Sequence, residues 1–261
     1  MVHLNISTTQ VQLLIVIFIR ISAILFAAPV FGGKNVPLIA KAGIAFALSL
    51  VLYPVVSHKI NPITNGIIFL GIGIAGEVIL GFIVGFAIRL VFAGIQLAGQ
   101  LVGFQMGMSI ANVLDPMSNN QVSIMSQLNY IFAFLIYLTL DAHHWLLRAL
   151  VESFTLVPPF EFVLSNALAE KMIFLANDMF VISIKIGAPI IAILLLTSAA
   201  FGLVARAVPQ MHIFIVSMPL QIMIGLLGTA WIFPYFVAYL TMIFEKLGRD
   251  ILILLKIMGS I

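Results

Sequence analysis

The stretch that decides the fold is ITNGIIFLGIGIAGEVILGFIVGFAIRLVFAGIQLAGQLVGFQMGMSIANVL, residues 63–114. It contains no proline, and nearly every side chain is apolar or small. As a single helix, these about fifty residues would be roughly 75 Å long. The hydrocarbon core of a bilayer is only ~30 Å thick. We therefore expect a helical segment that either turns back on itself or extends beyond the bilayer.

The composition of the whole chain indicates a membrane protein. Its 261 residues are 63% hydrophobic and 8% charged, and the mean hydropathy is +1.24. A soluble domain averages about a quarter charged residues because its surface must be wetted. The sequence therefore predicts an all-α, membrane-associated protein of long kinked helices and helical hairpins.

Composition also excludes several classes of function. The chain has no cysteine, which rules out a disulfide framework, a thiolate metal site and a thiol nucleophile. Its 12 Lys/Arg and 9 Asp/Glu are scattered singly, with no basic cluster to follow a phosphate backbone. We expect no nucleic-acid partner.

The N-terminal apolar run predicts a retained helix. Residues 1–10 carry no Lys or Arg, and the run 11–31 contains Arg20. A secretory signal has a basic start and an apolar region of roughly 7–15 residues, so a signal peptide is the weaker alternative. Proline and Gly-Gly breaks delimit further predicted helices, at residues 38–56, 128–154, 167–208 and 213–258, with kinks at Pro189, Pro219 and Pro234.

Glycines recur at four-residue spacing in the long apolar run. The spacing predicts close helix packing, because small residues four apart let two backbones approach. The packing could lie within the chain or between chains. The residues concerned are Gly81, Gly85, Gly99, Gly103 and Gly107.

Ionisable residues inside apolar runs are the most informative feature. Each would cost at least ~2.5–3.5 kcal/mol at the bilayer centre. Local pairing is poor: Glu77 and Arg89 would be about 18 Å apart along a helix, and Asp178 and Lys185 are two turns apart. Pairing with other helices or with other subunits is therefore predicted for Arg20, Glu77, Arg89, Asp178, Lys185 and Arg206. Lys41 is a further stranded charge.

No motif indicates catalysis, and we expect neither an enzyme nor a cofactor. His143 and His144 are adjacent, so on a helix they point about 100° apart and should not both face one metal ion. A structural or interfacial role is expected for them, and no metal. Ser109 lies in GMSIA, which lacks the second glycine of a nucleophile elbow. No phosphate-binding G-x-x-x-x-G-K-[ST] loop is present.

Three stretches resemble the FliR family of flagellar export-gate proteins, which includes the SctT proteins of virulence type III secretion. They are GFQMGMSIANVLDP at 103–116, DAHHWLLRALVESF at 141–154 and GLVARAVPQM at 202–211. Their order and spacing fit the family, and the resemblance covers essentially the whole chain. Asp141 and His212 stand where the family usually has Asn, which puts the local hydrogen bonding there in doubt.

The resemblance implies a fold and an assembly. Residues 1–165 would be FliP-like and residues 166–261 FliQ-like, together forming one structural unit. One copy would join several copies of FliP and FliQ around a pore for unfolded flagellar proteins, with FlhB as a further partner. The assembly would contact membrane lipid at the bacterial inner membrane, in the flagellar basal body, and would sit largely above the membrane plane.

By the same resemblance, the loop 106–121 would help to plug the pore. Its apolar side chains would form a soft surface that seals against water and yields to a passing chain. An ordinary surface loop is the alternative. The expected plug residues are Met106, Met108, Ile110, Val113, Leu114, Asp115, Pro116 and Met117.

Two other classes of function compete with a subunit of an export gate. A secondary transporter of a small solute would also place charges within broken apolar helices, but it should show an internal repeat, and none is visible in the sequence. An intramembrane enzyme would need a nucleophile–base pair or a metal cluster, and no motif in the sequence indicates either.

Overall fold

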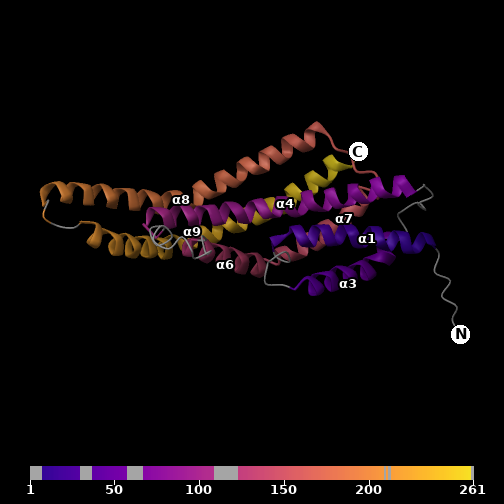
Figure 1. Ribbon diagram of the computed structural model, residues 1–261, viewed down its shortest axis with the longest axis horizontal. Helices are drawn as coiled ribbons and strands as arrows, with labels where there is room; N and C mark the ends of the chain where they lie inside the picture. The colour runs from indigo at the N-terminus through magenta and orange to yellow at the C-terminus, as the bar shows by residue number, and fades with distance from the viewer. Residues whose placement is uncertain are drawn as a thin grey trace. The chain divides into compact units, whose positions relative to one another are not determined.

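A computed structural model describes residues 8–29, 37–57, 67–108, 123–208, 210 and 213–259, and these ranges contain helices and no strand (Figure 1). The all-α prediction is confirmed. The helices are α1 (Thr8–Ala27), α3 (Leu38–Ser57), α4 (Ile67–Gln105), α6 (Ile124–Thr139), α7 (Ala142–Leu156), α8 (Asn166–Ala207) and α9 (Ile213–Met258).

Most predicted helix boundaries lie within a few residues of the observed ones. The expected single helix 128–154 is wrong, because a break at Leu140–Asp141 divides it into α6 and α7. Asp141 has a φ of 52°, in the left-handed region, and this backbone conformation ends one helix and starts the next. Apolar periodicity alone gave no sign of this break.

The long apolar run is one continuous helix from Ile67 to Gln105. Helix α4 has 39 residues, α8 has 42 and α9 has 46, which correspond to lengths of about 58, 63 and 69 Å. Within the described residues, five helices are long and apolar enough to cross a membrane, or six if α6 and α7 together count as one span. The described part of the run therefore does not turn back on itself.

The chain forms two compact units. Unit 1 comprises residues 1–90, 141–175 and 245–261, and unit 2 comprises residues 91–140 and 176–244. The predicted boundary at 165/166 coincides with the start of α8 at Asn166. Each unit nevertheless draws segments from both sides of that boundary, so the FliP-like and FliQ-like division stays a prediction.

In unit 1, α1 packs along α3 and along the first half of α4 (Figure 1). Phe18 of α1 and Phe46 of α3 meet edge to face, with ring centroids 6.3 Å apart. A backbone hydrogen bond of 3.1 Å from Val163 N–H to the carbonyl of Met258 joins the segment before α8 to the end of α9.

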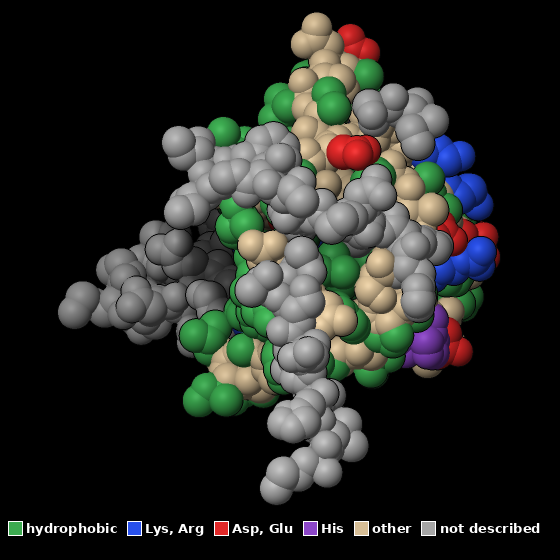
Figure 2. Space-filling view, turned by 90° about the vertical axis from the view of Figure 1, so that its right-hand side faces the viewer, with side chains coloured by type: hydrophobic (Ala, Val, Ile, Leu, Met, Phe, Trp, Pro, Cys, Tyr) green, Lys and Arg blue, Asp and Glu red, His purple; other side chains and the backbone are tan. Residues whose placement is uncertain are grey.

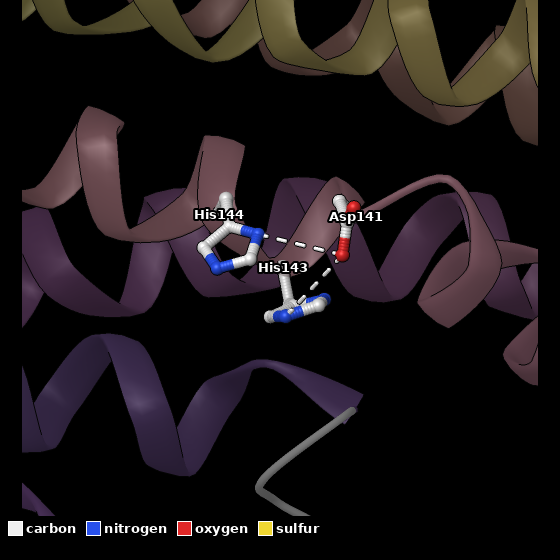
Figure 3. A group of neighbouring side chains, drawn as sticks. All are labelled: Asp141, His143 and His144. Carbon is white, nitrogen blue, oxygen red and sulfur yellow. Dashed lines mark ion pairs between the residues drawn. The ribbon is translucent and has the colours of Figure 1, made fainter.

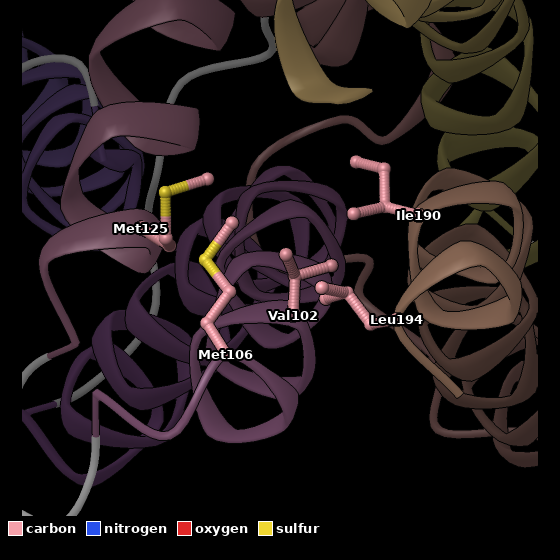
Figure 4. Close-up of a cluster of buried hydrophobic side chains, with 5 residues drawn as sticks. All are labelled: Val102, Met106, Met125, Ile190 and Leu194. Atoms are coloured by element: carbon pink, nitrogen blue, oxygen red, sulfur yellow. The ribbon is translucent and has the colours of Figure 1, made fainter. Parts of the chain in front are cut away.

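In unit 2, the core lies among α4, α6, α8 and α9. Val102, Met106, Met125, Ile190 and Leu194 form a buried cluster, shown in Figure 4. Beside it, Phe92 of α4 packs against Tyr130 and Tyr137 of α6 and against Phe244 of α9, each at a centroid distance of 5.7 Å.

Candidate functional site

Arg20 and Glu77 form a buried ion pair inside unit 1. Their side chains are 0% and 1% exposed. The Arg20 Nη2–H donates to Glu77 Oε1 at 2.9 Å, and Nε–H donates to Oε2. This two-point geometry is the strongest form of the pair. The predicted pairing with another helix is therefore confirmed for these two charges, and the alternative of pairing with another subunit is wrong for them, because Arg20 of α1 pairs with Glu77 of α4 within the chain.

The same ion pair also forms hydrogen bonds to α7 and to the turn after it. Arg20 Nη1 donates to the carbonyls of Ser153 and Val157, each at 2.9 Å, and the guanidinium carbon lies 4.4 Å from the Phe154 ring centroid. Glu77 Oε1 also accepts the Phe160 backbone N–H at 3.1 Å. We call these residues the Arg20 hub. Buried charges need such saturation by hydrogen bonds to be tolerated.

The other four residues predicted to pair with other helices or subunits are not part of the Arg20 hub. Arg89, Lys185 and Arg206 are exposed, and Asp178 is half-buried. The Lys185 ammonium lies 5.9 Å from the Tyr239 ring centroid, within cation–π range. For Arg89, Asp178, Lys185 and Arg206, pairing with other subunits stays a prediction.

Sequence reasoning missed one further ion pair in unit 1. Lys171 Nζ donates to Asp250 Oδ1 at 2.7 Å, and both side chains are largely buried. The two residues are 79 positions apart, so no local spacing could have indicated the pair.

The predicted packing glycines divide into two intrachain contacts and one turn. A methyl group on Gly81 would lie 2.5 Å from the Ala23 Cβ, and one on Gly85 would overlap Ala27, so α1 and α4 meet through small residues on both sides. Gly99 lies equally close to the start of α6, at Met125 and Ser126, and Gly103 lies against Ser123.

Gly107 has a different role from the one predicted. Its φ is +79°, its N–H donates to the Phe104 carbonyl at 3.0 Å, and the Met108 N–H donates to the Gly103 carbonyl at 3.1 Å. This pair of bonds is a Schellman motif, which ends α4 and requires a residue that adopts positive φ. Gly107 is therefore a helix-ending residue and not a packing residue.

The start of the predicted plug loop is anchored in the core of unit 2. Met106 is fully buried and packs beside Met125 (Figure 4). Gly225 leaves space for the Met106 side chain, and Met108 packs against the same cluster. Met106 therefore holds the loop instead of lining a pore, a correction to its expected role. The remaining expected plug residues lie outside the described residues: Ile110, Val113, Leu114, Asp115, Pro116 and Met117.

Charged side chains gather on one surface of unit 1. A groove of about 270 Å³ between α7 and the last part of α9 is lined by Trp145, Arg148, Glu152, Glu245 and Arg249, among others. Arg148 Nε donates to Glu152 Oε1 at 2.9 Å. Figure 2 shows basic and acidic side chains together with histidine at one edge of the face that it presents.

The histidine pair does converge, contrary to the expectation from helical spacing. His144 Nδ1 lies 3.5 Å and His143 Nε2 lies 4.0 Å from Asp141 Oδ1 (Figure 3). The two imidazole centroids are 4.2 Å apart. Both histidines lie in the first turn of α7, and the left-handed backbone of Asp141 brings its carboxylate beside them.

Comparison with known proteins supplies the family. The model of bacterial export proteins, family 1, matches residues 11–247. The chain is 34% identical to the flagellar biosynthetic protein FliR of Bacillus subtilis, over 81% of the chain and 82% of that relative. Identity to the FliR of Escherichia coli is 26%, over 88% of the chain and 87% of that relative. Identity to the FliR of Caulobacter vibrioides is 28%, over 83% of the chain and 86% of that relative. The chain therefore belongs to the bacterial export proteins of family 1, as a member of the FliR family of flagellar biosynthetic proteins.

Proposed function

We propose that the chain is a non-enzymatic core subunit of the flagellar export gate and forms part of the channel for unfolded flagellar proteins. Family membership carries the proposal, because the family is one of export proteins and the matched relatives are flagellar biosynthetic proteins. The proposed location is the bacterial inner membrane, within the flagellar basal body. The proposed partners are several copies of FliP and FliQ around one copy of this chain, and FlhB.

The mixed surface of α8 supports an assembly of several subunits. Lys185 is exposed, and so are Ile184 (59%), which precedes it, and Phe180 (54%) on the turn before. Lipid would disfavour the ammonium group by at least ~2.5 kcal/mol near the bilayer centre, and water would disfavour the two apolar side chains. A surface of another protein can satisfy both, which is what a neighbouring gate subunit would supply.

The length of α8 supports a position that extends beyond the bilayer. At about 63 Å, the helix is twice as long as the ~30 Å hydrocarbon core, and it continues through Pro189 without a break. Upright in a membrane, such a helix would leave about half of its residues outside lipid. Apolar residues there would need protein partners.

The loop after Met108 is proposed to plug the channel. Its base is firmly held, because the Schellman motif and buried Met106 fix where the chain leaves α4. The apolar residues that follow, among them Ile110, Val113 and Met117, would give a seal that yields to a passing chain.

Native mass spectrometry of the affinity-tagged chain, expressed in its own host and extracted gently, tests the proposal. We expect a large complex that contains one copy of this chain and multiple copies of two other small membrane proteins. A stable monomer or homodimer would contradict it. Uptake of a small solute by the purified chain, lost when Asp178 or Lys185 is replaced, would establish a secondary transporter instead.

A further inference from the structure

Asp141, His143 and His144 place three metal-ligating side chains together at the start of α7. Their ligand atoms all lie within 4.8 Å of one another. Ligands at about 2.0–2.1 Å from a tetrahedral Zn²⁺ are roughly 3.3 Å apart. The His144–Asp141 distance of 3.5 Å already approaches that value, and the His143–Asp141 distance of 4.0 Å needs a small side-chain rotation (Figure 3).

The donor set suits a transition metal. Two imidazoles and one carboxylate are the protein ligands of several zinc sites, in which water completes the coordination. Imidazole selects zinc, copper, iron or nickel over magnesium and calcium, which prefer oxygen ligands. The carboxylate also supplies the negative charge that a dication requires near two neutral rings.

The surroundings leave the ligand atoms accessible. The side chains of Asp141 and His144 are 71% and 65% exposed, and that of His143 is 29% exposed. In the described part of the chain, the buried Nδ1 of His143 has no hydrogen-bond partner. An ion bound through Nε2 would require the ring proton on Nδ1, the tautomer that a hydrogen-bond acceptor at Nδ1 usually fixes.

The geometry points to a surface site for one divalent transition-metal ion, of Zn²⁺ type, formed by Asp141, His143 and His144. The bound ion would link Asp141, the N-cap residue of α7, to the first turn of the same helix. It would thereby stabilise the left-handed backbone of Asp141, a conformation that a non-glycine residue adopts at a cost. This inference is independent of the proposed export function.

Metal titration of the full chain tests the site. The chain is purified in detergent through a tag without histidine, stripped with a chelator, and titrated with Zn²⁺ against a chromophoric competitor. We expect one ion per chain, at least tenfold weaker binding for His143→Ala, His144→Ala and Asp141→Asn, and a rise in Tm with Zn²⁺ in the parent protein. With Cu²⁺, electron paramagnetic resonance should show two nitrogen ligands.

Matched controls separate this site from casual binding. His58→Ala and His212→Ala remove histidines elsewhere in the chain and should leave affinity unchanged. Failure to bind Zn²⁺ at tenfold excess would overturn the inference, as would binding that persists in the His143→Ala/His144→Ala double variant. Because His144 is exposed, His144→Asn should fold normally and still lose the ion, which keeps the test valid if a double variant misfolds.

Discussion

Arg20 and Glu77 lie 57 positions apart and form a two-point ion pair with side chains 0% and 1% exposed. The pair joins α1 to α4, and its remaining hydrogen bonds reach α7 and the turn at Phe160. Each buried charge is tolerated only because the other is present, since removing one member leaves the other buried and unneutralised.

Glu77→Gln should destabilise unit 1 strongly. The Arg20 guanidinium would stay buried without its counter-charge, and such losses amount to about 3–5 kcal/mol. Thermal unfolding of the purified protein in detergent should show the loss. Arg89→Gln on the same helix is the control: Arg89 is exposed, so its change should stay within about 0.5 kcal/mol. Equal effects of the two substitutions on unfolding would contradict the claim that the Arg20–Glu77 pair stabilises unit 1.

Exchanging the two charges should not restore stability. In Arg20→Glu/Glu77→Arg, the new carboxylate at position 20 would face the carbonyls of Ser153 and Val157, which now accept hydrogen bonds from Arg20. Acceptors would then oppose acceptors in a dry site, and the cost would add to that of the lost hydrogen bonds. A Tm for the exchanged variant near that of the parent would show that charge neutralisation alone matters.

Gly225→Ala should displace the buried side chain of Met106, which holds the start of the predicted plug loop. A methyl group at Gly225 would overlap the side chain of Met106, which is fully buried. Overpacking of this kind costs about 1–3 kcal/mol. Gly228→Ala, one turn further along α9, is the matched control, because its nearest neighbour would be Ile193 Cδ1 at 4.0 Å.

A double-mutant cycle checks the cause. Met106→Ala removes the side chain that clashes, so Gly225→Ala should cost less in that background than in the parent protein. Strict additivity of the two changes in unfolding free energy would mean that Gly225 acts through another contact.

Gly81→Ala and Gly85→Ala should separate α1 from α4. Added methyl groups would meet Ala23 and Ala27, and the backbone of α1 lies within 3.0–3.1 Å of the same positions. Backbone cannot move aside as a flexible side chain can, so each substitution should lower the Tm. Gly71→Ala in the same helix has nothing within 4 Å and should be neutral or slightly stabilising, because alanine favours helices over glycine. A destabilised Gly71→Ala would assign the effect to the helix and not to the contact.

Deleting residues 109–117 should make the assembled gate leak, if the loop plugs the channel. Met106, Gly107 and Met108 are retained, so that the end of α4 and its packing in unit 2 stay intact. The measurement is the passage of small solutes across the membrane of cells that carry the variant gate, with assembly checked by co-purification. Normal assembly without an increase in leak would exclude the plug.

Local patterns in the sequence predicted much of the fold. Apolar runs and proline breaks placed α8 and α9 within a residue or two, because a helix too apolar for water has few alternatives in a membrane. The partners of buried groups could not be predicted. Nothing near Arg20 in sequence indicates Glu77, and nothing near Lys171 indicates Asp250, since such pairs depend on how the helices pack.

For two residues at helix ends, Gly107 and Asp141, the sequence contains some indication of the observed backbone conformation. Gly107 follows a long helix and precedes a segment rich in Asn, Asp and Pro, which is where a Schellman glycine is common. Because Gly107 also continues the four-residue spacing of the preceding glycines, that spacing predicts a packing role for it. The indication is weaker for Asp141. Aspartate adopts positive φ more readily than most residues, but the residues on both sides of Asp141 continue the helical pattern.

Arg206→Glu should impair assembly more than folding, if this exposed residue pairs with another subunit. Arg206 lies in the last turn of α8, where a positive charge also interacts favourably with the helix dipole, by about 0.3–1 kcal/mol. Arg206→Gln therefore serves as the control, because it removes the dipole interaction without adding a negative charge. Co-purification of the partner subunits should fall slightly for Gln and steeply for Glu, while the Tm of the isolated chain changes little between them. Equal recovery of partners with Gln, Glu and Arg at this position would show that the residue lies outside the subunit interface.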